Sequence, residues 1–405
     1  MSFSHPNTAA FRQAGAAQLA AGLQASRRDT LDTFAVYAEA LRASGMAVAY
    51  SAELNPPLWE LGHIGWFQEF WLARNPERER GAAADPDALR SPAQRPGADR
   101  LYDSSRVAHE SRWSLALPDA AATLSDLRAQ LQATLELLRH CAESDAALYF
   151  FRLVLAHEDM HHEAALYMAQ ALGLPVADSR WQPAPIPAAR NTAVLASGRF
   201  EIGHTGAGFA FDNERVAHML ALPESRIDLR VLRWDEFLPF VEAGGYEHER
   251  WWSRAGWAWR CGTQAQAPRY LRRDGARWSQ QRYGLWQALG LSEPACHLNL
   301  HEAEAWCAWA GRRLPSEAEW ERAAIERADE LRWGDVWEWT ASDFEAYPGF
   351  VAHPYRDYSQ PWFGSRRVLR GASFATQPRL RHARYRNYFE PARNDIFAGF
   401  RTCEV

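Results

Sequence analysis

Residues 145–173, "DAALYFFRLVLAHEDMHHEAALYMAQALG", decide the architecture of the first part of the chain. Apolar residues recur at three- and four-residue spacing throughout, which is typical of one long helix packed in a protein interior. Gly173 followed by Pro175 is a helix stop signal. Within the helix His157 and His161 are four residues apart. Their rings therefore project from one face, one turn apart, near enough to share a metal ion.

Three further stretches carry the same helical periodicity. One of them opens with two prolines, which favour a first helical turn, and places His63 among Leu61, Ile64 and Trp66. A histidine on an apolar face is usually a hydrogen-bonded core residue, but beside a two-histidine helix in the same bundle His63 becomes a third candidate ligand. Together with the helix above, these stretches predict a four-helix bundle: residues 30–45, 56–75 and 123–141.

His157, Glu158 and His161 also match the H-E-x-x-H pattern of zinc proteases. A metzincin would need glycine and histidine where Ala164 and Tyr167 stand, and the stretch after the helix contains a single acid, an aspartate. The protease interpretation is therefore disfavoured, and we expect Glu158 to be structural or to support a ligand. Three neutral imidazoles with open coordination positions suit Fe(II) and Zn(II) about equally, so the ligands alone leave the metal open.

Composition limits the classes of function. The chain has 405 residues, 47% of them hydrophobic, and a net charge of −5, which predicts two or three packed domains and no binding of nucleic acid. All 45 cationic residues are arginine, which excludes Schiff-base lysine chemistry and a Walker A loop. Without a secretory signal or a membrane span, we expect a cytoplasmic protein with no membrane partner. The five scattered cysteines predict reduced thiols.

A proline- and alanine-rich stretch at residues 179–194 predicts a linker between two domains. Residues 1–178 are predicted to form the helical part. Residues 195–405 are rich in glycine and tryptophan and predict short strands, with convincing helices only in "RWDEFLPFVEAGG" and "NLHEAEAWCAWAGRRLPSEAEWERAA". Between the second and third helices, residues 79–118 form a long connection broken by prolines, and such connections are often functional.

Five landmarks of the second half resemble the formylglycine-generating-enzyme (sulfatase-modifying) fold, a C-type-lectin-like mixed domain. The landmarks are "FEIGHTGAGFAFDNERVAH", "HLNLHEAEAWCAWAGRRLPSEAEWERAA", "GDVWEWTASDF", "RVLRGASFAT" and "FAGFRT". True formylglycine-generating enzymes use a cysteine pair before the last landmark, whereas this chain has Cys403 alone, beyond it. The resemblance therefore implies the fold without that activity.

A DinB-like bundle with His63, His157 and His161, followed by this domain, resembles the ergothioneine sulfoxide synthase family over nearly the whole chain. The resemblance implies a fold of α plus mixed α/β class, a four-helix bundle followed by a C-type-lectin-like domain. It also implies that the three histidines bind Fe(II) as cofactor. O₂ would then join a sulfur donor to C2 of the imidazole of hercynine, which is N-trimethylated histidine.

In that family the catalytic tyrosine follows the W-E-W-T landmark, where this chain offers Tyr355 and Tyr358. The resemblance makes Tyr355 the expected proton donor, with Tyr358 beside the substrate, although the choice between the two stays open. A phenol with a pKa of about 10 can hold a hydrogen bond without ionising.

The chain departs from the sulfur enzymes in its expected substrate contacts. Tyr388 and Phe389 stand where those enzymes place Trp-Asp, and an aromatic face can still hold a quaternary ammonium group by cation–π contact. Met160 stands where they often have glutamine. The long connection also lacks the arginine-rich pattern associated with γ-glutamylcysteine.

That connection resembles instead the selenoneine synthase branch, whose donor is a selenosugar. The main expectation is therefore oxidative C–Se bond formation with hercynine, and the alternative is a thiol donor such as γ-glutamylcysteine. A sugar needs hydroxyl partners, so the expected donor contacts are Ser105, Arg106 and Arg112, with Asp103, Ser104 and His109 beside them.

Two interpretations from other classes remain open: a zinc-dependent thiol transferase and a carbohydrate-binding lectin-like protein. The sequence does not define the oligomeric state, and a monomer is compatible with it.

Overall fold

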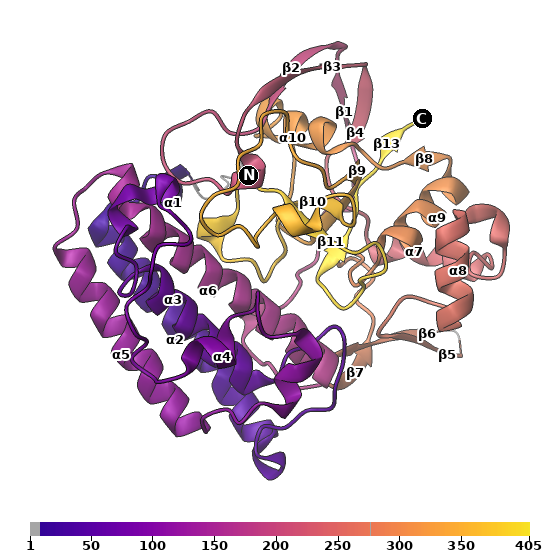
Figure 1. The fold of residues 1–405 in the computed structure, drawn as a ribbon. Coiled ribbons are helices and arrows are strands. Elements are labelled where there is room, and N and C mark those ends of the chain that lie inside the picture. Colours follow the sequence, from indigo (N-terminus) through magenta and orange to yellow (C-terminus); the bar gives the residue numbers. More distant parts are fainter. Residues whose placement is uncertain (1–8, 276) are drawn as a thin grey trace.

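The computed structural model describes residues 9–275 and 277–405. The first eight residues, which belong to the range expected for the helical domain, lie outside the described residues. Figure 1 shows a bundle of long helices beside a second part of small sheets and short helices. The expected fold class, a helical bundle followed by a mixed α/β domain, is confirmed.

From residue 9 onward, the first part contains the four expected long helices and two short ones. Helix α2 begins at Ala16, well before the periodic stretch, because Leu19 and Leu23 are buried and extend its apolar face. Helix α5 begins after Asp119, whose carboxylate accepts a hydrogen bond from the Ala122 amide (2.8 Å). The helices are α1 (Ala9–Arg12), α2 (Ala16–Ala40), α3 (Pro57–Trp71), α4 (Ala98–Tyr102), α5 (Ala120–Arg139) and α6 (Asp145–Leu172). None of the helices in the described ranges is long and apolar enough to cross a membrane.

Arg27 joins the four long helices. From α2 its guanidinium donates to Glu158 on α6 (2.7 and 3.1 Å) and to Gln68 on α3 (2.7 Å). It also donates to the carbonyl of Leu127 on α5 (2.6 Å). Arg27 and Glu158 are both buried, and these bonds offset the cost of removing their charges from water. The Glu158 carboxylate therefore has a structural role in the interior of the bundle.

The connection at residues 79–118 is packed against the start of α3. The Trp59 indole donates to the Leu101 carbonyl (2.7 Å), and the His109 ring bonds to the Leu54 carbonyl (2.7 Å). The Arg112 guanidinium lies 3.9 Å from the centre of the Trp59 ring. Helix α4, within this connection, is thereby held against α3.

The described residues of the second part form four small sheets, whose strand orders are β1-β4-β13-β8, β11-β10-β9-β12, β2-β3 and β5-β6-β7. The strands are β1 (Thr192–Leu195), β2 (Gly198–Ile202), β3 (His218–Leu222), β4 (Ser225–Asp228), β5 (Leu271–Asp274), β6 (Arg277–Arg282), β7 (Leu285–Ala288), β8 (Arg312–Arg313), β9 (Trp337–Asp343), β10 (Arg367–Gly371), β11 (Asn387–Phe389), β12 (Ala398–Gly399) and β13 (Cys403–Glu404).

Helices of the second part match the two expected pieces, although the second piece is divided into α9 and α10 by the short strand β8, and they include one that was not predicted, α8. It carries two glycines and exposes much of its surface, so its apolar pattern is weak, but Ser253 caps it by accepting a hydrogen bond from the Gly256 amide (3.2 Å). The helices are α7 (Trp234–Glu242), α8 (Arg254–Thr263), α9 (Leu300–Ala310) and α10 (Glu317–Glu326).

The β11-β10-β9-β12 sheet brings distant residues to the bundle. Strand β10 pairs antiparallel with both β9 and β11, with Trp337 opposite Gly371 and Tyr388 opposite Val368. The Trp337 indole donates to Glu163 on α6 (2.8 Å). This sheet therefore forms a wall that faces the helix carrying His157 and His161.

The stretch between the two parts is packed as well. Trp181 and Ile186 are buried, and the Trp181 ring lies 4.9 Å from the ring of His162 on α6. Arg230 donates to the Ala189 carbonyl (3.1 Å), and β1 begins at Thr192. These contacts fix the stretch on the surfaces of both parts.

Replacing Arg27 by alanine should destabilise the protein by about 3–5 kcal/mol, because Glu158 would be left buried and unpaired. Chemical denaturation followed by circular dichroism measures this change. Arg28→Ala removes the exposed neighbouring arginine and should change the free energy of unfolding by less than about 0.5 kcal/mol. Equal stability of Arg27→Ala and the unmodified protein would contradict the central place of this ion pair.

Candidate metal centre and active site

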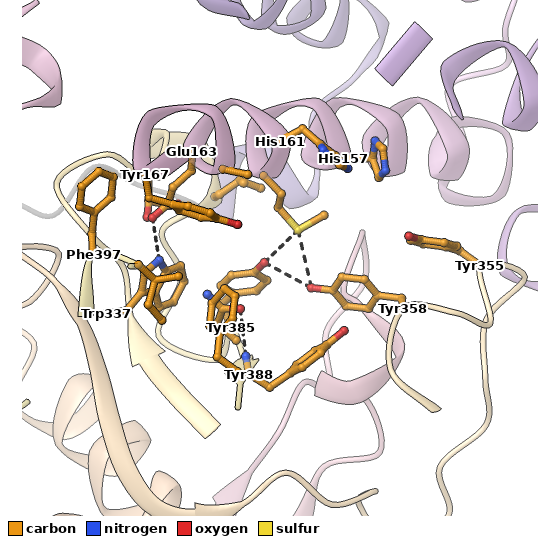
Figure 2. A pocket seen from close by; sticks show the side chains of 17 residues that line it. His157, His161, Glu163, Tyr167, Trp337, Tyr355, Tyr358, Tyr385, Tyr388 and Phe397 are labelled. Carbon is orange, nitrogen blue, oxygen red and sulfur yellow. Dashed lines mark hydrogen bonds between the residues drawn. The ribbon is translucent and has the colours of Figure 1, made fainter. Parts of the chain in front are cut away.

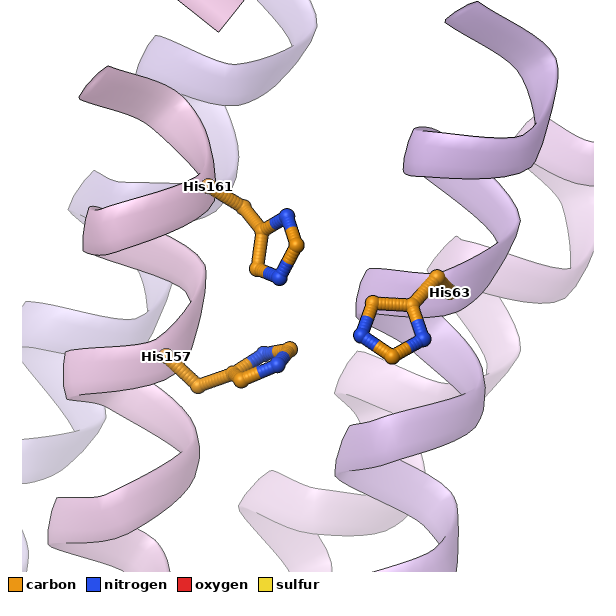
Figure 3. A group of neighbouring side chains, drawn as sticks. All are labelled: His63, His157 and His161. Carbon is orange, nitrogen blue, oxygen red and sulfur yellow. The ribbon is translucent and has the colours of Figure 1, made fainter. Parts of the chain in front are cut away.

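His63 on α3 faces His157 and His161 on α6 (Figure 3). One ring nitrogen from each lies within 4.8 Å of those from the other two. His63 and His157 are buried, and His161 is partly buried. Within residues 9–275 and 277–405, this is the one group of three histidine, cysteine or carboxyl side chains close enough to hold a metal ion.

Aromatic rings on α3 hold two of the imidazoles in place. Trp59, one turn before His63, stacks on it with ring centroids 4.8 Å apart and planes 9° from parallel. Phe67, one turn after His63, stacks on His157 at 3.5 Å and 2°. Because residues four apart share a helix face, α3 supplies one ligand and the packing for two.

Hydrogen bonds to the Nδ1 atoms of His63 and His161 define the tautomers of these two rings. His63 Nδ1 bonds to the carbonyl of Tyr102 in α4 (2.8 Å), and His161 Nδ1 bonds to the carboxylate of Glu60 (2.5 Å). Both partners are acceptors, so the Nδ1 atoms carry the protons and the Nε2 lone pairs stay free. His157 Nε2 is buried with no hydrogen-bond partner. A metal ion fits this donor set, because it would satisfy the three Nε2 atoms.

Burial keeps the imidazoles of His63 and His157 neutral. Burial, with the nearby His161, lowers the pKa of His63 to about 3. Burial and the two other histidines lower the pKa of His157 well below its ordinary value. Burial opposes ionisation of Glu60, but the attraction and hydrogen bond of His161 outweigh it and lower the pKa of Glu60. The neutral imidazoles of His63 and His157, near an ionised carboxylate, are suited to a divalent metal ion.

A cavity of about 250 Å³ lies beside the histidines, between α6 and the second part (Figure 2). One face of α6 lines it with His157, Met160, His161, Glu163, Ala164 and Tyr167. The other walls are Trp337, Tyr355, Tyr358, Thr376, Leu380, Tyr385, Asn387, Tyr388, Phe389, Ile396 and Phe397. The cavity is therefore mainly aromatic and of a size suited to a small molecule.

Glu163 brings a carboxyl group to this aromatic cavity. It accepts hydrogen bonds from the Trp337 indole (2.8 Å), the Ser373 hydroxyl (2.5 Å) and the Thr376 hydroxyl (2.7 Å). Burial raises the pKa of Glu163, and these hydrogen bonds oppose the shift. A cation in the cavity would favour the ionised carboxylate.

Met160 lies between the two α6 histidines in sequence, and its sulfur meets two phenols. It accepts hydrogen bonds from the hydroxyls of Tyr385 (3.2 Å) and Tyr358 (3.8 Å), whose oxygens are 3.2 Å apart. These contacts join α6 to the wall formed by the second part.

Tyr355 lies at the histidine end of the cavity. Its ring centroid is 6.2 Å from that of His157 and 4.9 Å from that of Phe67. Burial raises the pKa of Tyr355, and three carboxylates raise it further, those of Asp357, Asp103 and Asp212. The phenol therefore stays protonated at neutral pH and can donate a proton.

Two known families match the two parts of the chain. The DinB superfamily matches residues 23–165, and the sulfatase-modifying factor enzyme 1-like domain matches residues 179–333 and 330–404. The hercynine oxygenase of Mycolicibacterium smegmatis is 34% identical over 411 residues, covering 87% of this chain and 91% of the relative. The hercynine oxygenase of Mycobacterium tuberculosis is 34% identical over 401 residues, with the same two shares. The chain belongs to the hercynine oxygenase family.

Membership of the hercynine oxygenase family confirms the expected resemblance and indicates an oxidative enzyme. A formylglycine-generating enzyme of Streptomyces coelicolor is 29% identical over 289 residues, covering 56% of this chain and 90% of that enzyme. The cysteine pair expected for that activity remains missing, since Cys403 is a buried free thiol in β13.

In this member of the hercynine oxygenase family, most of the expected site residues lie together. The three histidines form one cluster, and seven expected residues line the adjoining cavity: His157, His161, Tyr355, Tyr358, Tyr388, Phe389 and Met160. The structure thus gathers the expected ligands, phenols and aromatic contacts around one space, and their roles stay predictions.

Three expected donor contacts lie away from the cavity lining. The Ser105 hydroxyl donates to Asp103 (2.6 Å), and the exposed Arg106 pairs with the same carboxylate (3.3 Å). Arg112 stacks on Trp59 and donates to Asn55 (2.8 Å). A direct contact of these three residues with a donor stays a prediction, and in this arrangement each is engaged elsewhere.

Glu163, Trp337 and Tyr385 line the cavity but were not predicted from the sequence. Glu163 was detectable, because it continues the face of α6 that starts at His157 and runs through Met160 to Tyr167. Trp337 and Tyr385 approach only through the folding of the second part, so the sequence offered no local signal for them.

His161→Ala should lose most of the Fe(II) bound after anaerobic reconstitution, because only two of the three imidazoles would remain. Elemental analysis of the desalted protein measures the iron. His162→Ala is the matched control: His162 is buried against Thr33, with Nε2 3.0 Å from its hydroxyl, outside the cluster, and its removal should leave iron content unchanged. Undiminished iron in His161→Ala would remove this residue from the metal centre.

Proposed function

We propose that the protein catalyses Fe(II)- and O₂-dependent bond formation between a thiol donor and C2 of the imidazole of hercynine. The observation that carries the proposal is the three-imidazole cluster beside an aromatic cavity that contains Glu163. Imidazoles with open coordination positions suit Fe(II). The hercynine oxygenase relatives, with the resemblance to ergothioneine sulfoxide synthases, support hercynine as the acceptor.

The cavity offers complementary places for the two ends of hercynine. Aromatic faces such as those of Trp337 and Tyr167 attract a quaternary ammonium group, and Glu163 adds a carboxyl partner. Tyr167 lies six residues beyond His161, about 9 Å along the axis of α6. With its ammonium group at that end, hercynine would direct its imidazole back toward the histidines.

Each component then has a defined task. Bound iron would supply the site where O₂ is reduced and where a soft thiolate is held. Tyr355, kept protonated by burial and nearby carboxylates, would supply a proton. Overall, a thiol, the C2–H bond of the imidazole and O₂ give a C2-linked sulfoxide and one water, which accounts for both oxygen atoms and both hydrogens.

A selenosugar is a second candidate donor, and the negative charge of the carboxylates near Tyr355 favours it. Asp103 and Asp357 both lie close enough to raise the pKa of Tyr355, after burial. The arginines of the same connection, Arg106 and Arg112, do not line the cavity. Carboxylates near the reacting end disfavour an anionic peptide there, whereas a neutral sugar escapes that repulsion.

The test is to supply Fe(II), O₂ and hercynine with either γ-glutamylcysteine or a selenosugar, and to follow O₂ uptake and products by mass spectrometry. We expect hercynine-dependent O₂ uptake and a C2-linked product. A product formed only from the selenosugar would replace the thiol donor, and one formed only from the peptide would eliminate the second candidate. The proposal would be overturned, in favour of a thiol transferase, by O₂ uptake and product formation that do not depend on hercynine. Equal activity with Zn(II) under anaerobic conditions would overturn it in the same way.

Glu163→Gln should raise KM for hercynine by about tenfold or more, because loss of one charge contact of about 1.4 kcal/mol weakens binding by that factor. KM for the donor should change little, since the expected seat of the donor is near Tyr355. Steady-state kinetics with each substrate varied in turn give both constants. An unchanged hercynine KM would show that Glu163 does not face the ammonium group.

A further inference from the structure

One carboxylate holds both ends of the segment that carries Tyr355 and Tyr358. The backbone N–H of His353 donates to Asp212 Oδ2 (3.4 Å), and the Ser359 hydroxyl donates to Asp212 Oδ1 (2.5 Å). Asp212 is 3% exposed and Ser359 is fully buried. The two tyrosines therefore lie on a short loop that is closed at its base by Asp212.

The loop has little regular structure of its own. Residues 344–359 contain no helix or strand, and the segment is folded by short-range bonds such as the one from the Tyr358 amide to the Tyr355 carbonyl (3.2 Å). Without a ladder of backbone bonds, the position of such a loop depends on the contacts at its ends.

Further contacts relate the loop to the metal-binding helix. The Tyr149 hydroxyl, on α6 two turns before His157, bonds to His353 Nδ1 (2.9 Å). Phe211, next to Asp212, stacks on Tyr358 with ring centroids 4.3 Å apart. The loop is therefore placed from α6 on one side and from the Phe211-Asp212 pair on the other.

Asp212 is itself held on a fixed base. It begins a short 3₁₀ helix, Asp212–Glu214, and the buried Glu214 carboxylate pairs with Arg12 of α1 (2.5 Å). The preceding Gly208 amide donates to Asp145 at the start of α6 (2.9 Å). These bonds connect the segment that contains Asp212, which holds the loop, to the helical part of the molecule.

We propose that Asp212 is a positioning residue that fixes Tyr355 relative to the metal centre and so selects coupling of the donor to hercynine over oxidation of the donor alone. The proposal rests on the proposed function. In coupling, a thiol, the imidazole C2–H and O₂ give a sulfoxide and water, with Tyr355 delivering a proton. If Tyr355 is displaced, a thiol and O₂ give a sulfinic acid, which takes both oxygen atoms and leaves hercynine unchanged.

Asp212→Asn tests this directly, because the amide keeps the shape of the side chain but replaces one acceptor with an N–H donor. The NH₂ group then meets either the His353 N–H, which it repels, or the Ser359 hydroxyl, which must turn round to accept from it. In both cases a charge-assisted bond to the carboxylate is lost. We expect the ratio of coupled product to oxidised donor to fall about tenfold or more, since small misplacements of a reacting group cost up to about 10²-fold. KM for hercynine should stay within about twofold of the unmodified value, because Asp212 does not line the cavity.

Ser359→Ala provides a second variant that loses only one bond and should shift the ratio in the same direction by less. Its matched control is Ser365→Ala, which loses an exposed hydroxyl bonded to the Trp362 carbonyl. For Asp212→Asn the matched control is Asp228→Asn, a buried carboxylate of β4 paired with Arg312 (2.8 Å), which should leave the ratio unchanged.

Hydrogen exchange of the metal-free protein supplies a readout that needs neither iron nor substrate. Amides of residues 351–361 should exchange faster in Asp212→Asn and in Ser359→Ala than in the unmodified protein and the two controls. Unchanged exchange, or an unchanged product ratio despite faster exchange, would overturn the proposal. Absence of hercynine-dependent O₂ uptake in the unmodified protein would refute the proposed function instead, while faster exchange would still support the grip of Asp212 on the loop.

Discussion

Ion pairs and hydrogen bonds on different faces of helix α6 fix how the helix is rotated about its own axis. Glu158 pairs with Arg27 of α2, and Asp159 pairs with Arg379 of the second part (2.6 Å for both bonds). Glu163 receives three hydrogen bonds from the second part. Turning the helix would leave several buried charges unpaired, which costs several kcal/mol for each. Because these faces of α6 are engaged in buried polar contacts, the histidines lie on the remaining face, toward α3 and the cavity.

This constraint explains why the first part of the fold could be predicted from the sequence. The apolar period of residues 145–173 predicts a long buried helix, and the four-residue spacing of His157 and His161 places both on one face. His63 was predicted as a third ligand because it lies on another helix of the same bundle, and the structure brings it within reach of the other two. Local periodicity is sufficient here because the helices carry the ligands themselves.

Other parts of the site depend on tertiary contacts that no local pattern encodes. The grouping of Ser105, Arg106 and Arg112 in one connection suggested a shared binding surface, but the connection folds so that Arg112 packs on Trp59 and Arg106 points to solvent. Tyr385 meets Met160 only because a distant segment returns to α6. Polar residues in irregular segments have no periodicity from which their direction could be derived.

The cavity joins a metal-type donor set at one end to an aromatic and carboxyl-bearing wall at the other. Met160, Tyr388 and Phe389 give this wall less polar character than the glutamine and Trp-Asp expected in the sulfur enzymes, and the phenols of Tyr358 and Tyr385 meet a sulfur atom. Recognition of a substrate that carries a quaternary ammonium group would therefore depend on aromatic faces and on Glu163.

The most direct measurement is the structure of anaerobic crystals soaked with Fe(II) and hercynine, with anomalous diffraction recorded at the iron edge. The account predicts one iron atom bound by Nε2 of His63, His157 and His161, with the hercynine ammonium group beside Glu163 and its imidazole toward the metal. Iron bound by other residues, or hercynine bound outside this cavity, would contradict it.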